Sequence, residues 1–157
     1  MVLNCLQVIT LKAISRLWTG LRRLQMHCKR GYVLTIDHGY LKAAMYKVSR
    51  KQGTLLCYYK HKVYEKIYKN IGLQDMTCYV NFTALIYRGT KNRLIECGFT
   101  DQCQFLMSLG FGQVLISMLS NEPDVVRALI KAAGITQTLL IEMGNKIKVL
   151  ILQKGIG

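Results

Sequence analysis

The residues best suited to chemistry follow a short apolar run. Residues 32–36 read Tyr-Val-Leu-Thr-Ile, and Asp37 and Gly39 come directly after them. A run that is rich in β-branched and aromatic residues and apolar on both faces is typical of a buried parallel strand. Open α/β sheets bind their ligands at the carboxyl ends of such strands. Asp37 and Gly39 are therefore expected to lie at a ligand-binding edge.

Other common catalytic signatures are missing from the sequence. The Gly110-Phe111-Gly112 segment does not follow a strand, so it is not a nucleotide-binding fingerprint. There is no serine nucleophile elbow, and the three histidines, His27, His38 and His61, are scattered along the chain. The six cysteines form no Cys-x-x-Cys pair and have no zinc-like spacing to histidine. We interpret them as reduced thiols, several of them buried as small apolar residues.

The elements around Asp37 are those of an α/β fold. Residues 4–28 carry apolar side chains at helical spacing with a basic outer face, and Gly31 comes just after this amphipathic helix. Asn81 and either Thr100 or Asp101 are suited to cap further helices. The pattern predicts strands over 32–37 and 147–153 in one sheet, shorter strands near 53–59 and 93–99, a turn over 70–74, and helices over 81–89, 101–119 and 124–133.

Composition limits the class of protein further. The chain has 157 residues, of which 51% are hydrophobic, enough for one domain with a buried core. Its net charge of +14 is compatible with nucleic acid, an anionic membrane surface or an acidic protein as partner, and equally with a plain basic surface. Because no stretch of about 18 residues stays apolar, we predict no membrane span.

The first acidic residue is Asp37, and the residues before it are strongly basic. An acid-poor amphipathic start that contains arginine is typical of mitochondrial presequences, and also of an ordinary basic helix. Serine is sparse there and no small-residue cleavage site follows. We therefore expect a helix of a cytoplasmic protein, with a mitochondrial location as the alternative.

Five segments, taken in order, resemble a known family. They are GYVLTIDHGY at 31–40, GTLLCYYKHK at 53–62, GLQDMTCYVNFTAL at 72–85, GFTDQCQFLMSLGF at 98–111 and KVLILQKGI at 148–156. Together they resemble the MidA family of class I S-adenosylmethionine-dependent methyltransferases. The resemblance runs from Gly31 to Gly157 and is weaker over residues 1–30.

The resemblance implies a fold and an activity. The chain would be the carboxy-terminal half of a Rossmann-like methyltransferase sheet with flanking helices, whose last strand is antiparallel to its neighbours. Residues 1–30 would form the basic helix before the sheet strand, and 31–157 the remainder of the domain. The parent activity would be methyl transfer to a protein arginine. Mitochondrial relatives modify a subunit of respiratory complex I, so that subunit or a homologue is the implied protein partner.

The resemblance also assigns roles to individual residues. Methyl transfer to nitrogen depends more on the alignment of the acceptor nitrogen than on acid–base chemistry. For an arginine acceptor, carboxylates would provide this alignment by orienting the guanidinium group. Asp37 and Asp75 are the candidates for orientation, and His61 is a third catalytic candidate. The structural alternative is that Asp37 caps a turn and Asp75 starts a strand. The residues that the matched motifs place in substrate binding are Gly39, Tyr40, Thr54, Gln74 and Asn81.

Three motif positions differ from the family pattern. Histidine replaces tyrosine at His38, tyrosine replaces histidine at Tyr79, and asparagine replaces aspartate at Asn81. If the family's histidine serves its active site, the change at Tyr79 puts activity in question.

The family's glycine-rich cofactor loop lies upstream of anything in this sequence. The family's cofactor, S-adenosylmethionine, is therefore not expected to bind this chain alone, which we expect to be inactive. A missing half would also expose a sheet edge and invite self-association. Two alternatives are a non-catalytic basic module that binds nucleic acid, and a gene remnant without function.

Overall fold

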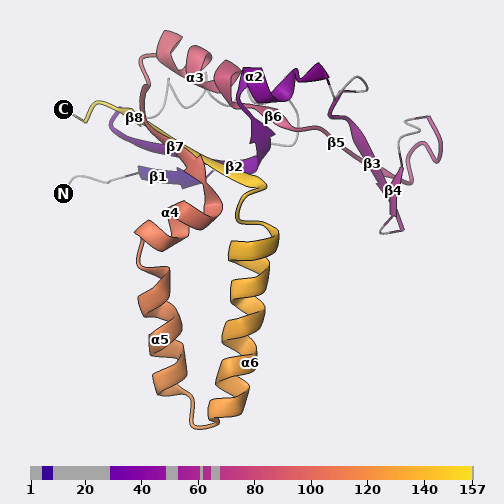
Figure 1. The fold of residues 1–157 in the computed structure, drawn as a ribbon. Helices are drawn as coiled ribbons and strands as arrows, with labels where there is room; N and C mark the ends of the chain where they lie inside the picture. Colours follow the sequence, from indigo (N-terminus) through magenta and orange to yellow (C-terminus); the bar gives the residue numbers. More distant parts are fainter. Residues whose placement is uncertain (1–4, 9–28, 49–52, 61, 65–67, 157) are drawn as a thin grey trace.

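The computed structural model describes residues 5–8, 29–48, 53–60, 62–64 and 68–156. Its centre is a five-stranded sheet in the order β1-β2-β8-β7, with a short strand beside the end of β2 (Figure 1). The long strand β2 pairs in parallel with β1 and antiparallel with β8, which is also antiparallel to β7. The strands are β1 (Cys5–Val8), β2 (Gly31–Tyr40), β6 (Val80–Asn81), β7 (Ile95–Asp101) and β8 (Ile147–Lys154).

One helix covers the centre of this sheet. Helix α3 (Phe82–Lys91) begins at Asn81, whose side-chain oxygen accepts a hydrogen bond from the backbone N–H of Ala84 at 3.0 Å. This cap satisfies one of the amides that a helix leaves free at its start. Its buried face packs on the sheet in a single apolar cluster, formed by Val33, Val80, Phe82, Leu85, Leu94, Leu150 and Leu152.

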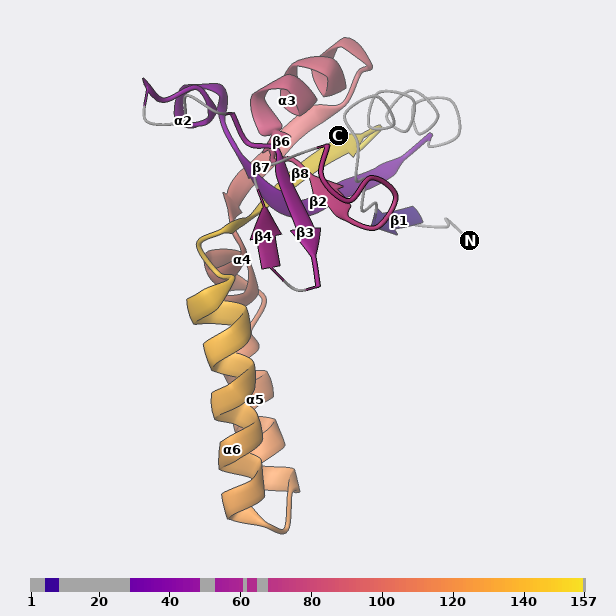
Figure 2. The same cartoon turned by 90° about the vertical axis from the view of Figure 1, so that its right-hand side faces the viewer.

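A smaller, three-stranded sheet lies beside the main one (Figure 2). It has the order β4-β3-β5, and all its pairs are antiparallel. Its strands are β3 (Leu56–Tyr59), β4 (Lys62–Tyr64) and β5 (Asp75–Thr77). The short helix α2 (Lys42–Met45) lies between β2 and this sheet in the chain.

A helical hairpin projects from the main sheet on the side opposite α3 (Figures 1 and 2). Helix α4 (Gln102–Ser108) follows β7, and its cap is Asp101, which accepts from the N–H of Gln104 at 2.9 Å. The hairpin itself consists of α5 (Phe111–Asn121) and α6 (Val125–Thr136), and α6 continues as the π-helical segment η2 (Gln137–Glu142). The chain then returns to the sheet as β8.

Most predicted elements of the sheet are confirmed. The strands expected over 32–37 and 147–153 are β2 and β8, and they pair directly. The strand expected near 93–99 is β7, and the helix expected over 81–89 is α3. The antiparallel last strand is also confirmed, because β8 runs opposite to both of its neighbours.

The helical region expected over 101–119, with a break at Gly110-Phe111-Gly112, is α4 followed by α5, and the positive φ of 84° at Gly110 turns the chain between them. One helix prediction needs correction. The helix expected over 4–28 is wrong at its start, since Cys5–Val8 form the strand β1. These residues pair with residues 31–34 of β2, and a local helical pattern does not reveal such a pairing with a distant strand. Residues 9–28 lie outside the described residues.

No single helix in the described ranges is long and apolar enough to cross a membrane. The consecutive helices α4 and α5 have the length and composition of a membrane span only when they are taken together. The axes of these two helices are bent by 67° relative to each other.

Candidate active site

Asp37 lies near the carboxyl end of β2 and is half-buried. Burial raises the pKa of this carboxyl group above its usual value of 3.8, because it removes water from the charged form. The backbone N–H of His38 donates to Oδ1 of Asp37 at 2.7 Å and partly opposes this rise, as does the charge of His38. The side chain is therefore a partly desolvated carboxylate at a strand end, and a cation beside it would stabilise the charged form.

Gly39 allows the segment around β6 to lie against β2. A Cβ at this position would overlap the carbonyl oxygen of Val80 and lie 2.6 Å from a ring carbon of Phe82. In the parallel pairing of β2 with β6, Gly39 lies opposite Val80 and Tyr40 opposite Asn81. The glycine thus brings residues 79–82 to the strand end that carries Asp37.

Three aromatic rings gather at this strand end. The ring of Tyr79 stacks on that of His38, with centroids 6.2 Å apart and planes at 26°. The same ring meets Tyr40 edge to face at 5.4 Å. His38 and Tyr79 are two of the positions where the sequence differs from the MidA pattern, and here they contact each other. Sequence reasoning recorded both changes but not their contact, which requires the pairing of β2 with β6.

A shallow pocket of about 520 Å³ lies between the α2 segment and the start of α3. It is lined by residues 41–43 and Tyr46, in or next to α2, and by Thr83 of α3, and its polar members are Lys42, Tyr46 and Thr83. The Nδ2 group of Asn81 donates to the Tyr46 hydroxyl at 3.5 Å, and Oγ1 of Thr83 accepts from the backbone N–H of Lys42 at 2.9 Å. Tyr46 and Thr83 were not among the predicted site residues, although Thr83 lies in the matched segment 72–85; Tyr46 lies in none of the five segments.

The other predicted site residues belong to different parts of the fold. Asp75 is exposed in β5, where it pairs with Tyr58 of β3. Thr54 and Gln74 are half-buried in the segments that lead into β3 and β5. His61 lies outside the described residues. The structure thus brings together Asp37, Gly39, Tyr40 and Asn81, while Asp75, Thr54 and Gln74 belong to the smaller sheet and its approaches.

Metal chemistry has no candidate site in the described part of the chain. In those ranges, no three His, Cys, Asp or Glu side chains lie close enough together to hold a metal ion. The cysteine Cys57 is fully buried, as expected of a small apolar residue.

Two solved structures from Burkholderia thailandensis share this fold. One is an uncharacterized protein, which matches with a TM-score of 0.81 and 31% sequence identity. The match covers 89% of this chain and 37% of that protein. The other, a member of the same superfamily bound to S-adenosyl-homocysteine, matches with a TM-score of 0.80 and 31% identity over 89% of this chain and 36% of its own. The chain therefore spans little more than a third of the proteins it matches.

The mixed α/β architecture is thus that of a methyltransferase fold. No protein of curated function matches the sequence. Residues 12–99 match the family described as putative S-adenosyl-L-methionine-dependent methyltransferases. Because that match spans more than half of the 157 residues, the chain belongs to this methyltransferase family.

Proposed function

We propose that the chain carries the acceptor side of a methyltransferase that modifies an arginine of a protein, and that it is the carboxy-terminal portion of such an enzyme. The observation that carries the proposal is the half-buried carboxylate of Asp37 at the end of β2. Support comes from the likeness to a structure bound to S-adenosyl-homocysteine. The resemblance to the MidA family supports arginine as the methylated residue, and a complex I subunit or its homologue as the substrate protein.

The local geometry suits a guanidinium. A cationic group beside Asp37 would offset the desolvation that raises the pKa of its carboxyl group. The rings of Tyr40 and Tyr79 lie at the same strand end, and aromatic rings stack well on planar guanidinium groups. Asp37 would thus fix the orientation of the acceptor nitrogen, and the two tyrosines would hold the plane of its group.

The residues His38 and Tyr79 support the proposal that this strand end is still an active-site surface. Histidine and tyrosine have swapped positions relative to the family pattern, yet the two rings stack on each other at 6.2 Å. One imidazole and one phenol are therefore still present at the strand end. The loss of histidine at position 79 is accompanied by its gain at position 38, so the chemistry of the pair is kept.

The described residues do not fit the cofactor. A glycine-rich turn from a parallel strand into a helix allows the backbone to approach such a ligand closely. In the described part of the chain, glycines lie at the ends of two strands, Gly155 directly after β8 and Gly39 in β2, and of these two strands only β2 leads into a helix, α2. There the space around Gly39 is already taken by Val80 and Phe82. We therefore propose that S-adenosylmethionine does not bind to this chain alone.

Calorimetric titration of the purified chain with S-adenosylmethionine tests this cofactor proposal. We expect no heat of binding up to millimolar cofactor. A dissociation constant in the micromolar range would show that residues outside the described ranges complete a cofactor site.

A chimeric enzyme tests the proposed activity. The chain would replace the matching third of the Burkholderia relative, and transfer of labelled methyl groups to protein arginine would be measured. We expect activity that Asp37→Asn lowers by about a hundredfold, since alignment by an oriented group supplies rate factors of that order. Glu96→Gln is the matched control, because Glu96 is an exposed carboxylate in β7 with no proposed role in the site. A folded, cofactor-binding chimera without arginine methylation would contradict the proposal.

One observation favours nucleic-acid binding as a second candidate function. Two lysine ammonium groups beside the smaller sheet lie over tyrosine rings of its strands, Lys60 over Tyr59 at 5.4 Å and Lys69 over Tyr64 at 6.0 Å. Basic and aromatic groups together are typical of single-strand binding surfaces. Binding to random RNA that weakens steeply with salt would support this function, and no binding at low salt would remove it.

A further inference from the structure

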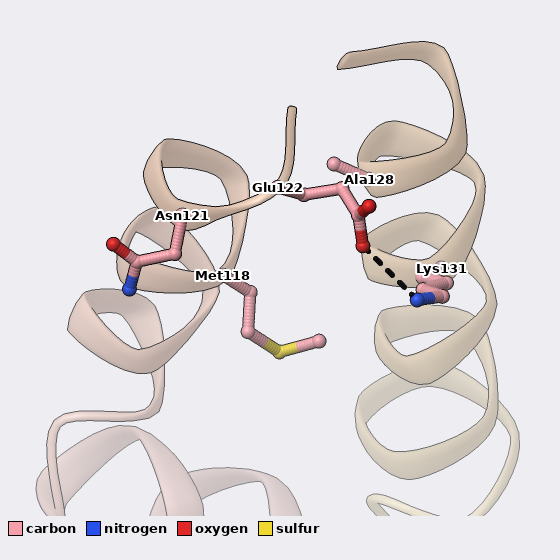
Figure 3. A pocket seen from close by; sticks show the side chains of 5 residues that line it. All are labelled: Met118, Asn121, Glu122, Ala128 and Lys131. Carbon is pink, nitrogen blue, oxygen red and sulfur yellow. Dashed lines mark hydrogen bonds and ion pairs between the residues drawn. The ribbon is translucent and has the colours of Figure 1, made fainter. Parts of the chain in front are cut away.

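The helical hairpin packs through the facing sides of its two helices. Met118 of α5 and Ala128 of α6 line a small pocket of about 180 Å³ between the helices (Figure 3). Close by, the ammonium group of Lys131 donates to the Glu122 carboxylate at 3.2 Å. Ala128 and Ala132 are the buried residues of α6. The inner side of α6 is thus built from small residues and is already in contact with α5.

The opposite side of α6 is apolar and open to solvent. Val126, Leu129 and Ile130 are 67%, 52% and 69% exposed. With Ala133 they form a stripe at positions i, i+3, i+4 and i+7, which we call the α6 stripe. This spacing is the one that packs a helix against a second helix. Contiguous exposed apolar side chains of this kind mark an interaction surface.

The distribution of charge indicates which partner fits the α6 stripe. Residues 102–142 contain three acidic residues, Glu122, Asp124 and Glu142, and two basic ones, Arg127 and Lys131. The excess that gives the chain its net charge of +14 therefore lies entirely outside this segment. An anionic membrane or a nucleic acid would be attracted to those other surfaces. The hairpin itself is nearly neutral, so a second copy of it can pack against the first without repulsion between like charges.

The available area agrees with a weak dimer. A buried valine, leucine or isoleucine side chain removes on the order of 100 Å² from water. Val126, Leu129 and Ile130, exposed by 67%, 52% and 69%, therefore offer roughly 190 Å² of apolar area per copy. Because interfaces are about 60% apolar, this corresponds to roughly 300 Å² per partner, well below the roughly 800 Å² of a standard interface and in the range of a weak, concentration-dependent contact.

We propose that the α6 stripe is the interface of a two-fold symmetric homodimer, in which α6 of one copy packs on α6 of the other. A two-fold axis brings the same patch of both copies together, so a continuous apolar stripe on α6 is self-complementary. The two hairpins then form a four-helix arrangement at the end of the molecule away from α3. This surface is separate from the edge of β1 and from Asp37, so the proposal does not depend on the proposed activity.

Sedimentation velocity of the full chain over a range of concentrations tests the dimer. We expect a wild-type dimer and an Ile130→Glu variant whose dissociation constant is raised at least about a hundredfold, because both copies would bury a charge. Ile71→Glu is the matched control, since Ile71 is 75% exposed and lies outside the hairpin. That variant should dimerise like the wild type. Circular dichroism checks the fold, and Ile130→Lys gives a second test if the glutamate variant unfolds.

Hydrogen exchange locates the interface. Raising the protein concentration should slow exchange over residues 125–133. A wild-type chain that stays monomeric at all concentrations overturns the proposal. So does a dimer that survives Ile130→Glu and instead protects Cys5–Val8, which would assign association to the edge of β1. A monomeric chain that binds phosphatidylserine vesicles, and loses this binding in Ile130→Glu, would assign the α6 stripe to lipid and overturn the dimer.

Discussion

At the scale of single residues, ionised Asp37 lowers the stability of the folded chain and is also the proposed contact for the substrate arginine. Burial opposes its charged form, and the N–H of His38 and the charge of the His38 ring only partly compensate. A carboxylate held in this state stabilises the folded protein less than an exposed one does. A bound cation would stabilise the ionised carboxylate and so restore the stability that burial removes. For this reason Asp37 is the proposed contact for an arginine.

The stability of the chain should therefore depend on Asp37 in a defined pH direction. Because the folded pKa is raised, the folded state holds the proton more tightly than the unfolded state. Stability consequently falls as the pH rises from the unfolded value of 3.8 through the folded pKa. Asp37→Asn should have a higher melting temperature than the wild type at pH 7, with the difference shrinking below about pH 4. An equal or lower melting temperature at pH 7 would show that ionised Asp37 has stronger partners than described.

Gly39 should tolerate no side chain. The added methyl of Gly39→Ala would overlap the Val80 carbonyl and press on the ring of Phe82. Overpacking of this kind costs about 1–3 kcal/mol, so the free energy of unfolding in urea should fall by that amount. Gly98→Ala is the control, because Gly98 lies in β7 with no atom within 4 Å of the added Cβ. Equal stability of the two variants would contradict the close packing of β2 on β6.

At the scale of elements, the cap of α3 joins the fold to the candidate site. Asn81 holds the helix start through Ala84 and reaches Tyr46 beside the pocket. Asn81→Ala should lower the free energy of unfolding by about 1 kcal/mol, because the Ala84 amide loses its acceptor. Asn81→Asp keeps the acceptor and adds a negative charge at a helix N-terminus, which should raise stability by about 0.3–1 kcal/mol. Urea unfolding measures both, and a loss of stability in Asn81→Asp would contradict the assigned cap.

The elements that local patterns describe well were predicted from the sequence. Short apolar runs rich in β-branched residues marked β2 and β8, and Asn81 and the pair Thr100-Asp101 marked the starts of helices. The strand β1 was missed because its pairing depends on the distant residues 31–34 of β2. The two-residue strand β6 is too short to carry a pattern, and only its contact with Gly39 and Tyr40 reveals it.

At the scale of the whole molecule, the candidate site was predicted in part. Asp37 and Gly39 could be found because a strand end is a local feature. Tyr79 was identified from the sequence only as a changed motif position, and its contact with His38 required the structure. Tyr46 could not be found, because it reaches the site beside α2, whose position depends on tertiary contacts. The hairpin was expected as separate helices, but its projection from the sheet and the exposure of Ile130 required the structure.

The central claim is that this chain carries the acceptor side of a methyltransferase and not its cofactor side. A nuclear magnetic resonance titration of the isotopically labelled chain tests it most directly, with an arginine-containing peptide and S-adenosyl-homocysteine added to separate samples. The account predicts that the peptide shifts the amide signals of residues 37–40 and 79, and that the cofactor product shifts none of them. A response to S-adenosyl-homocysteine at these amides, with none to the arginine peptide, would contradict it.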